Sequence, residues 1–217
     1  MAVIITGLQT TTEVLGVEDD LYISPTGQIA SNILGVSGVA SGNEITIAGS
    51  IYGSSGGIDL SDANSTGRVS LTILGGGSIS SVDGYAVTVL VDTNTVTNFG
   101  SLSSNVETAV QLLGSGNFLF NDGDISTTSP SSLEPAVQLG FQAELVNSGT
   151  IFARQTAVSA GNDFDMENSG TIQGGLVSVS IGSDARIFNS GLLTGDTVAI
   201  ASGSGADITN TGTIQSR

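Results

Sequence analysis

Apolar and polar residues alternate over short segments of this chain, and the same alternation returns at a fixed interval. The pattern aliphatic-x-Asn-x-Gly-x-aliphatic occurs four times, over residues 145–151, 166–172, 187–193 and 208–214. The glycines of these copies, at positions 149, 170, 191 and 212, are each 21 residues apart. A fixed period of roughly 20–50 residues is the sequence signature of a repeat architecture.

The repeat continues toward the N-terminus with wider spacing. Corresponding glycines stand at positions 27, 49, 77, 100 and 123, and at all nine glycines the residues four before and two after are aliphatic. The residue two before is Asn in the last six copies, whereas Pro25, Ile47 and Gly75 stand there in the first three. We therefore expect the asparagines to stack at a bend, bonded along the ladder, and each glycine to supply a corner with φ > 0.

A second marker falls between successive glycines, beginning at Ala86, Ala109, Ala136, Ala157, Ser178 and Ala199. Both markers alternate with period two and are rich in β-branched residues, which is typical of strands rather than helices. A coil of this length cannot bury its own apolar face, but stacked coils can.

The sequence therefore predicts an all-β chain, a single-stranded parallel β-solenoid (β-helix) of about nine rungs of 21–23 residues with two longer outward loops. Inward residues should stack into three columns along the rod. The first contains Val137, Val158, Val179 and Ile200, the second contains Leu145, Met166, Ile187 and Ile208, and the third contains Ile151, Ile172, Leu193 and Ile214.

The rod is expected to span residues 21–217. Residues 1–20 are predicted to be an N-terminal segment or an irregular first coil, with a strand exchanged between subunits as the alternative. Insertions at 53–67 and 126–135 account for the two longest gaps between glycines, 28 and 26 residues, and are expected to be the outward loops.

Charge and composition narrow the chemistry. The formal net charge is −16, and the chain has no His, Lys or Cys. Imidazole, Schiff-base and thiolate chemistry are thereby excluded. The four arginines are too few for a basic patch, which argues against nucleic acid and anionic membrane as partners. The start has neither the basic region nor the apolar length of a classical signal peptide, and no segment reaches the ~20 apolar residues of a membrane span.

Three carboxylates are the strongest candidates for chemistry. Asp163, Asp165 and Glu167 alternate and are expected to face outward on one strand, with Arg186 one rung over. Such a set suits glycoside hydrolysis or a calcium ion, which makes calcium the one cofactor considered. The Gly-Gly-x-Gly-x-Asp calcium repeat is absent. A solvated face is the favoured interpretation, so no catalytic, cofactor-binding or metal residue is assigned and no enzyme is predicted.

Two further features carry little weight. An Asn-x-Ser/Thr sequon begins at Asn64 in the first insertion. Thr150, Thr171 and Thr213 fall in one column, as ice-binding solenoids require, but Leu192 interrupts it.

The recurring Asn-Ser-Gly-Thr-Ile and Ala-Val motifs resemble repeats of bacterial secreted β-solenoid proteins. These are autotransporter passengers, filamentous-haemagglutinin-type adhesins and type I-secreted surface proteins. The resemblance covers about residues 21–215 and implies an extracellular or cell-surface protein, exported without a classical N-terminal signal. It carries over no catalytic or ligand residue, because the matching residues are core and corner positions.

The leading functional hypothesis is a structural subunit. The repeat runs to Ile214 with no polar cap, and open sheet edges at both ends are templates for head-to-tail pairing into an extracellular filament with a matrix, adhesion or biofilm role. The alternative is a monomeric adhesin module, or a fragment of one, that binds a glycan or host surface through its loops. A polysaccharide-active enzyme is the third hypothesis.

Overall fold

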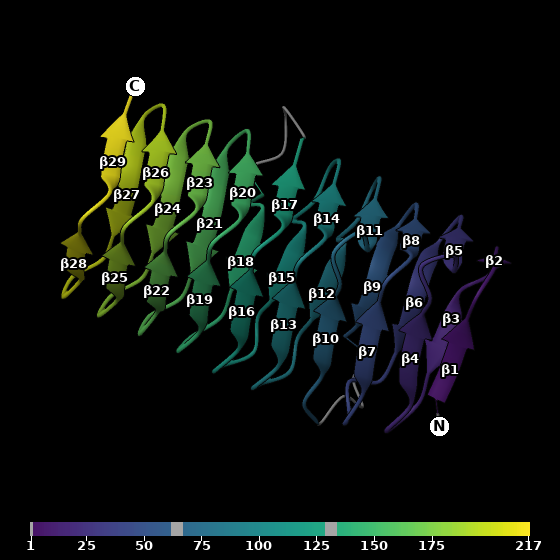
Figure 1. Ribbon diagram of the computed structural model, residues 1–217. Helices are drawn as coiled ribbons and strands as arrows, with labels where there is room; N and C mark the ends of the chain where they lie inside the picture. The colour runs from purple at the N-terminus through teal and green to yellow at the C-terminus, as the bar shows by residue number, and fades with distance from the viewer. Residues whose placement is uncertain (1, 62–66, 129–133) are drawn as a thin grey trace.

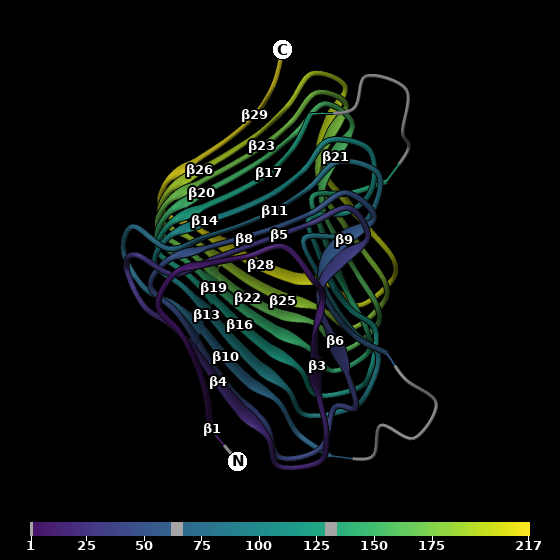
Figure 2. The same ribbon diagram turned by 90° about the vertical axis from the view of Figure 1, so that its right-hand side faces the viewer.

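In the computed structural model, which describes residues 2–61, 67–128 and 134–217, the chain winds into a parallel β-solenoid (Figure 1). Each described strand pairs in parallel with strands one coil before or after it, and the described residues contain no helix. The strands form three sheets, here called A, B and C, which make the three walls seen along the rod in Figure 2. The predicted fold of about nine coils is confirmed.

One coil contributes one strand to each sheet in the order A, B, C. Sheet A contains β1 (Ala2–Ile5), β4 (Asp20–Ile23), β7 (Glu44–Ile47), β10 (Ser70–Ile73), β13 (Thr95–Asn98), β16 (Phe118–Asn121), β19 (Glu144–Asn147), β22 (Asp165–Asn168), β25 (Arg186–Asn189) and β28 (Asp207–Asn210). Sheet B contains β2 (Leu8–Gln9), β5 (Gln28–Ser31), β8 (Ser50–Gly53), β11 (Ser78–Ser81), β14 (Ser101–Ser104), β17 (Asp124–Thr127), β20 (Thr150–Ala153), β23 (Thr171–Gly174), β26 (Leu192–Gly195) and β29 (Thr213–Ser216). Sheet C contains β3 (Glu13–Leu15), β6 (Leu34–Gly38), β9 (Gly56–Leu60), β12 (Val87–Val89), β15 (Val110–Leu112), β18 (Val137–Leu139), β21 (Thr156–Ala160), β24 (Val177–Ile181) and β27 (Val198–Ser202).

The core is a set of aliphatic columns along the rod. The three predicted columns are confirmed by the register: Val158 pairs with Val179 in sheet C, Met166 with Ile187 in sheet A, and Ile151 with Ile172 in sheet B. Their side chains are buried except near the C-terminal end of the rod. Along each strand the inward aliphatic residues alternate with outward residues, as successive side chains of a strand point to opposite faces.

The predicted asparagine ladder is confirmed. Asn98 Nδ2 donates to Asn121 Oδ1 at 2.7 Å, and the same bond repeats from Asn121 through 147, 168 and 189 to Asn210 at 2.7–2.8 Å. The first five amides of the ladder are almost wholly buried. A buried amide is tolerated because each one is both a donor and an acceptor to its neighbours.

The prediction that the nine repeat glycines adopt a positive φ is wrong. None of them is among the positive-φ residues. Glycine is required there because adjacent coils approach closely: a Cβ on Gly170 would lie 2.1 Å from the Gly149 carbonyl oxygen, and a Cβ on Gly191 would lie 2.1 Å from the Gly170 oxygen. The glycine column is therefore a line of backbone contact between coils.

The left-handed corner lies elsewhere, two residues before the sheet A strands. Residues with φ between 53° and 77° occupy it in eight coils: Glu18, Gly42, Thr93, Gly116, Gln142, Asp163, Asp184 and Gly205. Five of these are not glycine, and a left-handed conformation strains a residue that has a Cβ.

The register also corrects the alignment of two early copies. Leu21 and Leu71, not Ile23 and Ile73, share the column of Ile45, because the turns before Gly27 and Gly77 are longer. Ile23, Ile47 and Ile73 instead occupy the column that the asparagines take from Asn98 onward. Pro25 and Gly75 lie in those longer turns and not in the column.

The N-terminal segment forms a complete first coil. Strand β1 pairs with β4 of the same chain, β2 with β5 and β3 with β6. The expected loop at 53–67 is shorter than predicted, because Gly56–Leu60 is strand β9 of sheet C. In the second insertion, 126–135, residues 126 and 127 belong to β17. The segments 62–66 and 129–133 lie outside the described residues.

Candidate functional site

The outer face of sheet A is hollowed in its C-terminal half. A groove of about 380 Å³ crosses β19, β22, β25 and β28, and it is lined by Glu144, Asp165, Met166, Glu167, Arg186, Ile187, Phe188, Asp207 and Thr209. The groove lies over two rows of outward side chains that strand pairing aligns from one coil to the next. One row contains Glu144, Asp165, Arg186 and Asp207, and the other contains Val146, Glu167, Phe188 and Thr209.

Phe188 provides the apolar surface of this groove. Its side chain is 44% exposed, although it lies in a strand between Glu167 and Thr209 of the neighbouring coils. An exposed aromatic ring on a flat sheet can stack on a planar or apolar ligand face, and its π-face attracts cations.

Four carboxylates and one guanidinium line the groove. Arg186 Nη1 lies 3.5 Å from Asp165 Oδ2, and both side chains are more than half exposed, at 78% and 52%. A pair so exposed contributes at most about 1 kcal/mol to stability. Since four carboxylates face one guanidinium, the groove carries an excess of negative charge. The predicted proximity of Arg186 to Asp165 is confirmed.

The structure separates the predicted carboxylate trio. Asp165 and Glu167 face outward on β22 as expected. Asp163 does not lie on that strand but in the left-handed corner before it, with φ 56° and its N–H bonded to the Ser183 carbonyl at 3.0 Å. The other acidic residues that line the groove with Asp165 and Glu167 are Glu144 and Asp207, which the sequence analysis did not identify. Within the described parts of the chain, no group of three acidic residues is arranged to hold a metal ion.

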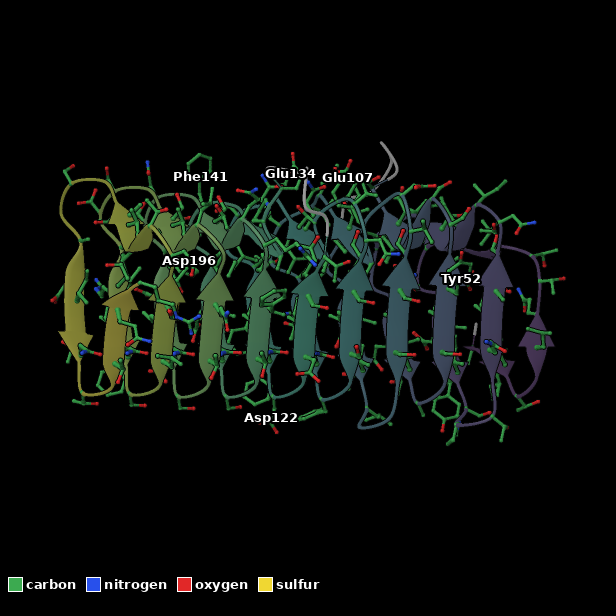
Figure 3. All side chains as sticks on the ribbon, turned by 90° about the horizontal axis from the view of Figure 1, so that it is seen from above. Tyr52, Glu107, Asp122, Glu134, Phe141 and Asp196 are labelled. Atoms are coloured by element: carbon green, nitrogen blue, oxygen red, sulfur yellow. The ribbon has the colours of Figure 1, made fainter. Side chains whose placement is uncertain are left out.

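A second hollow, of about 520 Å³, follows the glycine column at the corner of sheets A and B. Its rim includes Phe99, Asp122 and Asp124. Phe99 and Phe120 form a tilted ring pair with centroids 5.7 Å apart. Figure 3 shows Asp122 on one long edge of the rod and Glu107, Glu134 and Phe141 on the opposite edge.

The expected threonine column of sheet B is interrupted as predicted, since Leu192 pairs between Thr171 and Thr213. Sheet A carries a short row that the repeat did not reveal, in which Thr46, Thr72 and Thr97 share one outward column. Phe120 ends that row in the next coil. The sequon at Asn64 lies outside the described residues.

The two ends of the rod differ in polarity. In the first coil Gln9 takes the column position of Ile29, and Glu13 takes that of Val36. Gln9 Nε2 donates to Glu13 Oε2 at 3.0 Å. Val3, Ile5 and Leu15 of the same coil face the core, whereas Ile4, Leu8 and Val14 are exposed at 64%, 65% and 69%. The outer edges of β1, β2 and β3 have no partner strand among the described residues, so the expected unpaired edges are present in this coil too.

The last described coil keeps apolar residues at the same column positions. Ile200, Ile208 and Ile214 are the last described members of the columns of sheets C, A and B, and Ile208 is 42% exposed. The outer edges of β27, β28 and β29 have no partner strand among the described residues. Unpaired edges beside exposed core residues are templates for further strand pairing.

Comparisons with protein families, curated proteins and solved structures each gave no match. In the portion of the chain that the structure describes, no helix is long and apolar enough to cross a membrane. The three stacked parallel sheets define the class of this chain as a parallel β-solenoid.

Proposed function

We propose that this chain is a structural rod protein, without enzymatic activity, that associates end to end with copies of itself at the cell surface or outside the cell. The observation that carries the proposal is that Ile200, Ile208 and Ile214 keep inward column positions in the last described coil, where β27, β28 and β29 have no outer partner strand among the described residues. Pairing these edges would bury the isoleucines and satisfy backbone N–H and C=O groups together.

The remaining surface supports a structural role. The outer faces are dominated by Ser, Thr and acidic side chains, and the net charge of −16 opposes lateral clumping of rods. Extracellular placement rests on the resemblance of the Asn-Ser-Gly-Thr-Ile repeats to secreted bacterial solenoids. The head-to-tail filament predicted from the repeat pattern is one way in which such rods could associate end to end.

Negative-stain electron microscopy of the 217-residue chain, over a range of concentrations and with or without calcium, tests the proposal. Objects longer than one rod and of the same width are expected, and their share should rise with concentration. Light scattering after size exclusion gives the mass of the same samples. A monomer of 21.6 kDa at every concentration would refute end-to-end association.

A second candidate function is glycan binding in the groove of sheet A. Phe188 offers a stacking surface, and Glu144, Asp165 and Glu167 accept hydrogen bonds from hydroxyl or ammonium groups. The excess of carboxylates favours a glycan that carries amino groups, since ion pairing and cation–π attraction then act together. This candidate moves the glycan site of the adhesin hypothesis from the insertions to the sheet.

Calorimetry with glucosamine oligomers tests this candidate, with fully N-acetylated oligomers as the uncharged control. Binding of the amino form that weakens with salt is expected. Phe188→Ala should remove that binding, whereas Phe141→Ala, an exposed aromatic at another corner, should leave it unchanged. Equal affinity for both oligomers would show that charge has no part in recognition.

A further inference from the structure

The charged residues of the sheet A groove are spread over four successive coils rather than along one strand. Glu144 lies on β19, Asp165 on β22, Arg186 on β25 and Asp207 on β28, and strand pairing aligns all four in one outward row. These strands lie side by side along the rod (Figure 1). Neighbouring strands are ~4.8 Å apart, so the row is about 14 Å long. A ligand that contacts all four groups must therefore lie along the rod, across the strands.

An extended chain of hexose units suits a row of this kind. One hexose unit of such a chain is about as long as the spacing between coils, so four linked units place one unit over each coil. Glu144, Asp165 and Asp207 then each have one unit within reach, and Glu167 shares the unit over β22. Carboxylates favour units that carry an ammonium group, because a charge-assisted hydrogen bond forms between them.

Strand β25 differs from the other three strands of the groove. It brings Arg186 and Phe188 to the same outward face, and Arg186 is the one basic side chain among the described residues that line the groove. A guanidinium repels an ammonium group and donates hydrogen bonds to oxygen acceptors, while an aromatic ring stacks on the apolar face of a sugar ring. The unit over β25 should therefore carry an oxygen acceptor in place of an ammonium group.

An acetamide fits this position better than a carboxylate does. A carboxylate on the ligand would lie between Asp165 and Asp207 of the neighbouring coils, and like charges repel at such distances. The carbonyl oxygen of an N-acetyl group accepts a hydrogen bond from Arg186 without adding negative charge. The groove thus favours an uncharged, N-acetylated unit at β25.

The Arg186 side chain is accessible for this contact. Its Nη1 lies 3.5 Å from Asp165 Oδ2, which engages one of the five N–H donors of a guanidinium. With 78% of the side chain exposed, the guanidinium remains within reach of a ligand that lies on the sheet.

We infer that the groove selects a partly N-acetylated glucosamine chain that lies along the rod. An N-acetylated unit lies over Arg186 and Phe188, and amino units lie over the carboxylates of the coils on either side. The inference rests on the proposed glycan binding and names the direction and the substitution pattern of the ligand. Arg186 is the residue that determines specificity, because it decides where along the chain an acetylated unit is preferred.

Titration calorimetry of the 217-residue chain with glucosamine tetramers tests the substitution pattern. The tetramers carry four amino groups, a single acetyl group on the second or on the third unit, or four acetyl groups. One of the two singly acetylated tetramers should bind about three to five times more tightly than the all-amino tetramer, as expected for one exposed charged contact. The fully acetylated tetramer should bind most weakly. The preferred isomer gives the direction of the chain in the groove.

Two arginine variants separate specificity from overall charge. Arg186→Ala should remove the preference, so that the all-amino tetramer binds at least as tightly as the singly acetylated ones. Arg154→Ala removes an exposed arginine that does not line the groove and should keep the preference. If the parent does not distinguish the tetramers, or if Arg186→Ala keeps the preference, the inference fails while glycan binding stands. If no tetramer binds to the parent, the proposed glycan binding fails and the inference fails with it.

Carboxylate variants test the placement along the rod. Glu144→Gln and Asp207→Asn remove charges that lie three coils apart, and each should weaken binding of the preferred tetramer about threefold. Asp196→Asn removes an exposed carboxylate that does not line the groove and should leave the affinity unchanged. A ligand lying along β22 alone would contact neither Glu144 nor Asp207, so unchanged affinity in both groove variants would overturn the placement along the rod.

Discussion

Asn147 Nδ2 donates to Asn168 Oδ1 at 2.7 Å, although the two residues are 21 positions apart in the chain and both side chains are almost wholly buried. The bond joins coils rather than residues within a coil. It ties the buried polar column to the stacking of the sheets, since the amide-to-amide bond forms only if the next coil is in place, although Asn147 also donates to the Gly149 carbonyl of its own coil.

Asn168→Ala should therefore lower stability strongly. It leaves the Asn147 donor and the Asn189 acceptor without their ladder partners, which costs about 3 kcal/mol in all at about 1–3 kcal/mol for each buried group. Urea unfolding followed by circular dichroism measures the change. Asn210→Ala is the matched control, because Asn210 is exposed at the end of the ladder and its loss should cost much less.

Gly170→Ala should be among the most damaging small substitutions. The new methyl group would lie 2.1 Å from the Gly149 carbonyl oxygen, so the coils must separate locally, at a cost of about 3 kcal/mol. Gly7→Ala is the control, since no atom lies within 4 Å of a Cβ there. Equal midpoints for the two variants in urea unfolding would contradict the close-contact role of the glycine column.

Thr93→Gly should stabilise the rod. Thr93 has φ 58°, a left-handed conformation that strains a β-branched residue, and Gly116 holds the same place in the next coil. Relief of the strain, less the entropy that glycine loses on folding, leaves a gain of up to about 1 kcal/mol.

Thermal unfolding measures this gain. Thr95→Gly is the control, because Thr95 lies two residues later in strand β13 and glycine weakens a strand. The two substitutions should shift the melting temperature in opposite directions, and a loss of stability in both would argue against strain at the corner.

Arg186→Ala should change the free energy of unfolding by less than about 1 kcal/mol, because the Asp165–Arg186 pair is largely exposed. If the groove binds an amino-bearing glycan, the same variant should bind it more tightly, since the only cation lining the groove is removed while all four carboxylates remain. Scanning calorimetry on the variant and the parent measures the change in stability, and titration calorimetry on the same two proteins measures the change in glycan affinity. Weaker binding would indicate that Arg186 itself contacts the ligand.

The fold and the inward columns were predictable because each coil repeats the same alternation, and the period of 21 residues fixes which residues align. The asparagine ladder followed from the same count. Counting residues back from each glycine assigns the wrong column where the turns differ in length. Because the turns before Gly27 and Gly77 are longer, Leu21 and Leu71, and not Ile23 and Ile73, align with Ile45. The reason for the glycine column was missed because the contact lies between coils.

The candidate surfaces were harder to predict. Glu144 and Asp207 join Asp165 only through pairing between coils, and Asp163 does not line the groove because it lies in the corner before β22. Gln9 and Glu13 look like ordinary members of an alternating segment. Their place in the core columns became visible only when the register aligned them with Ile29 and Val36.

The asparagine ladder also gives the rod an electrical direction. Every amide from Asn98 to Asn189 points its N–H toward the C-terminal end and its oxygen toward the N-terminal end. Aligned amide dipoles add, as peptide dipoles do along a helix. The buried row therefore places partial positive charge near Asn210 and partial negative charge near Asn98, so an anion brought to the C-terminal end would meet a favourable field inside an otherwise acidic molecule.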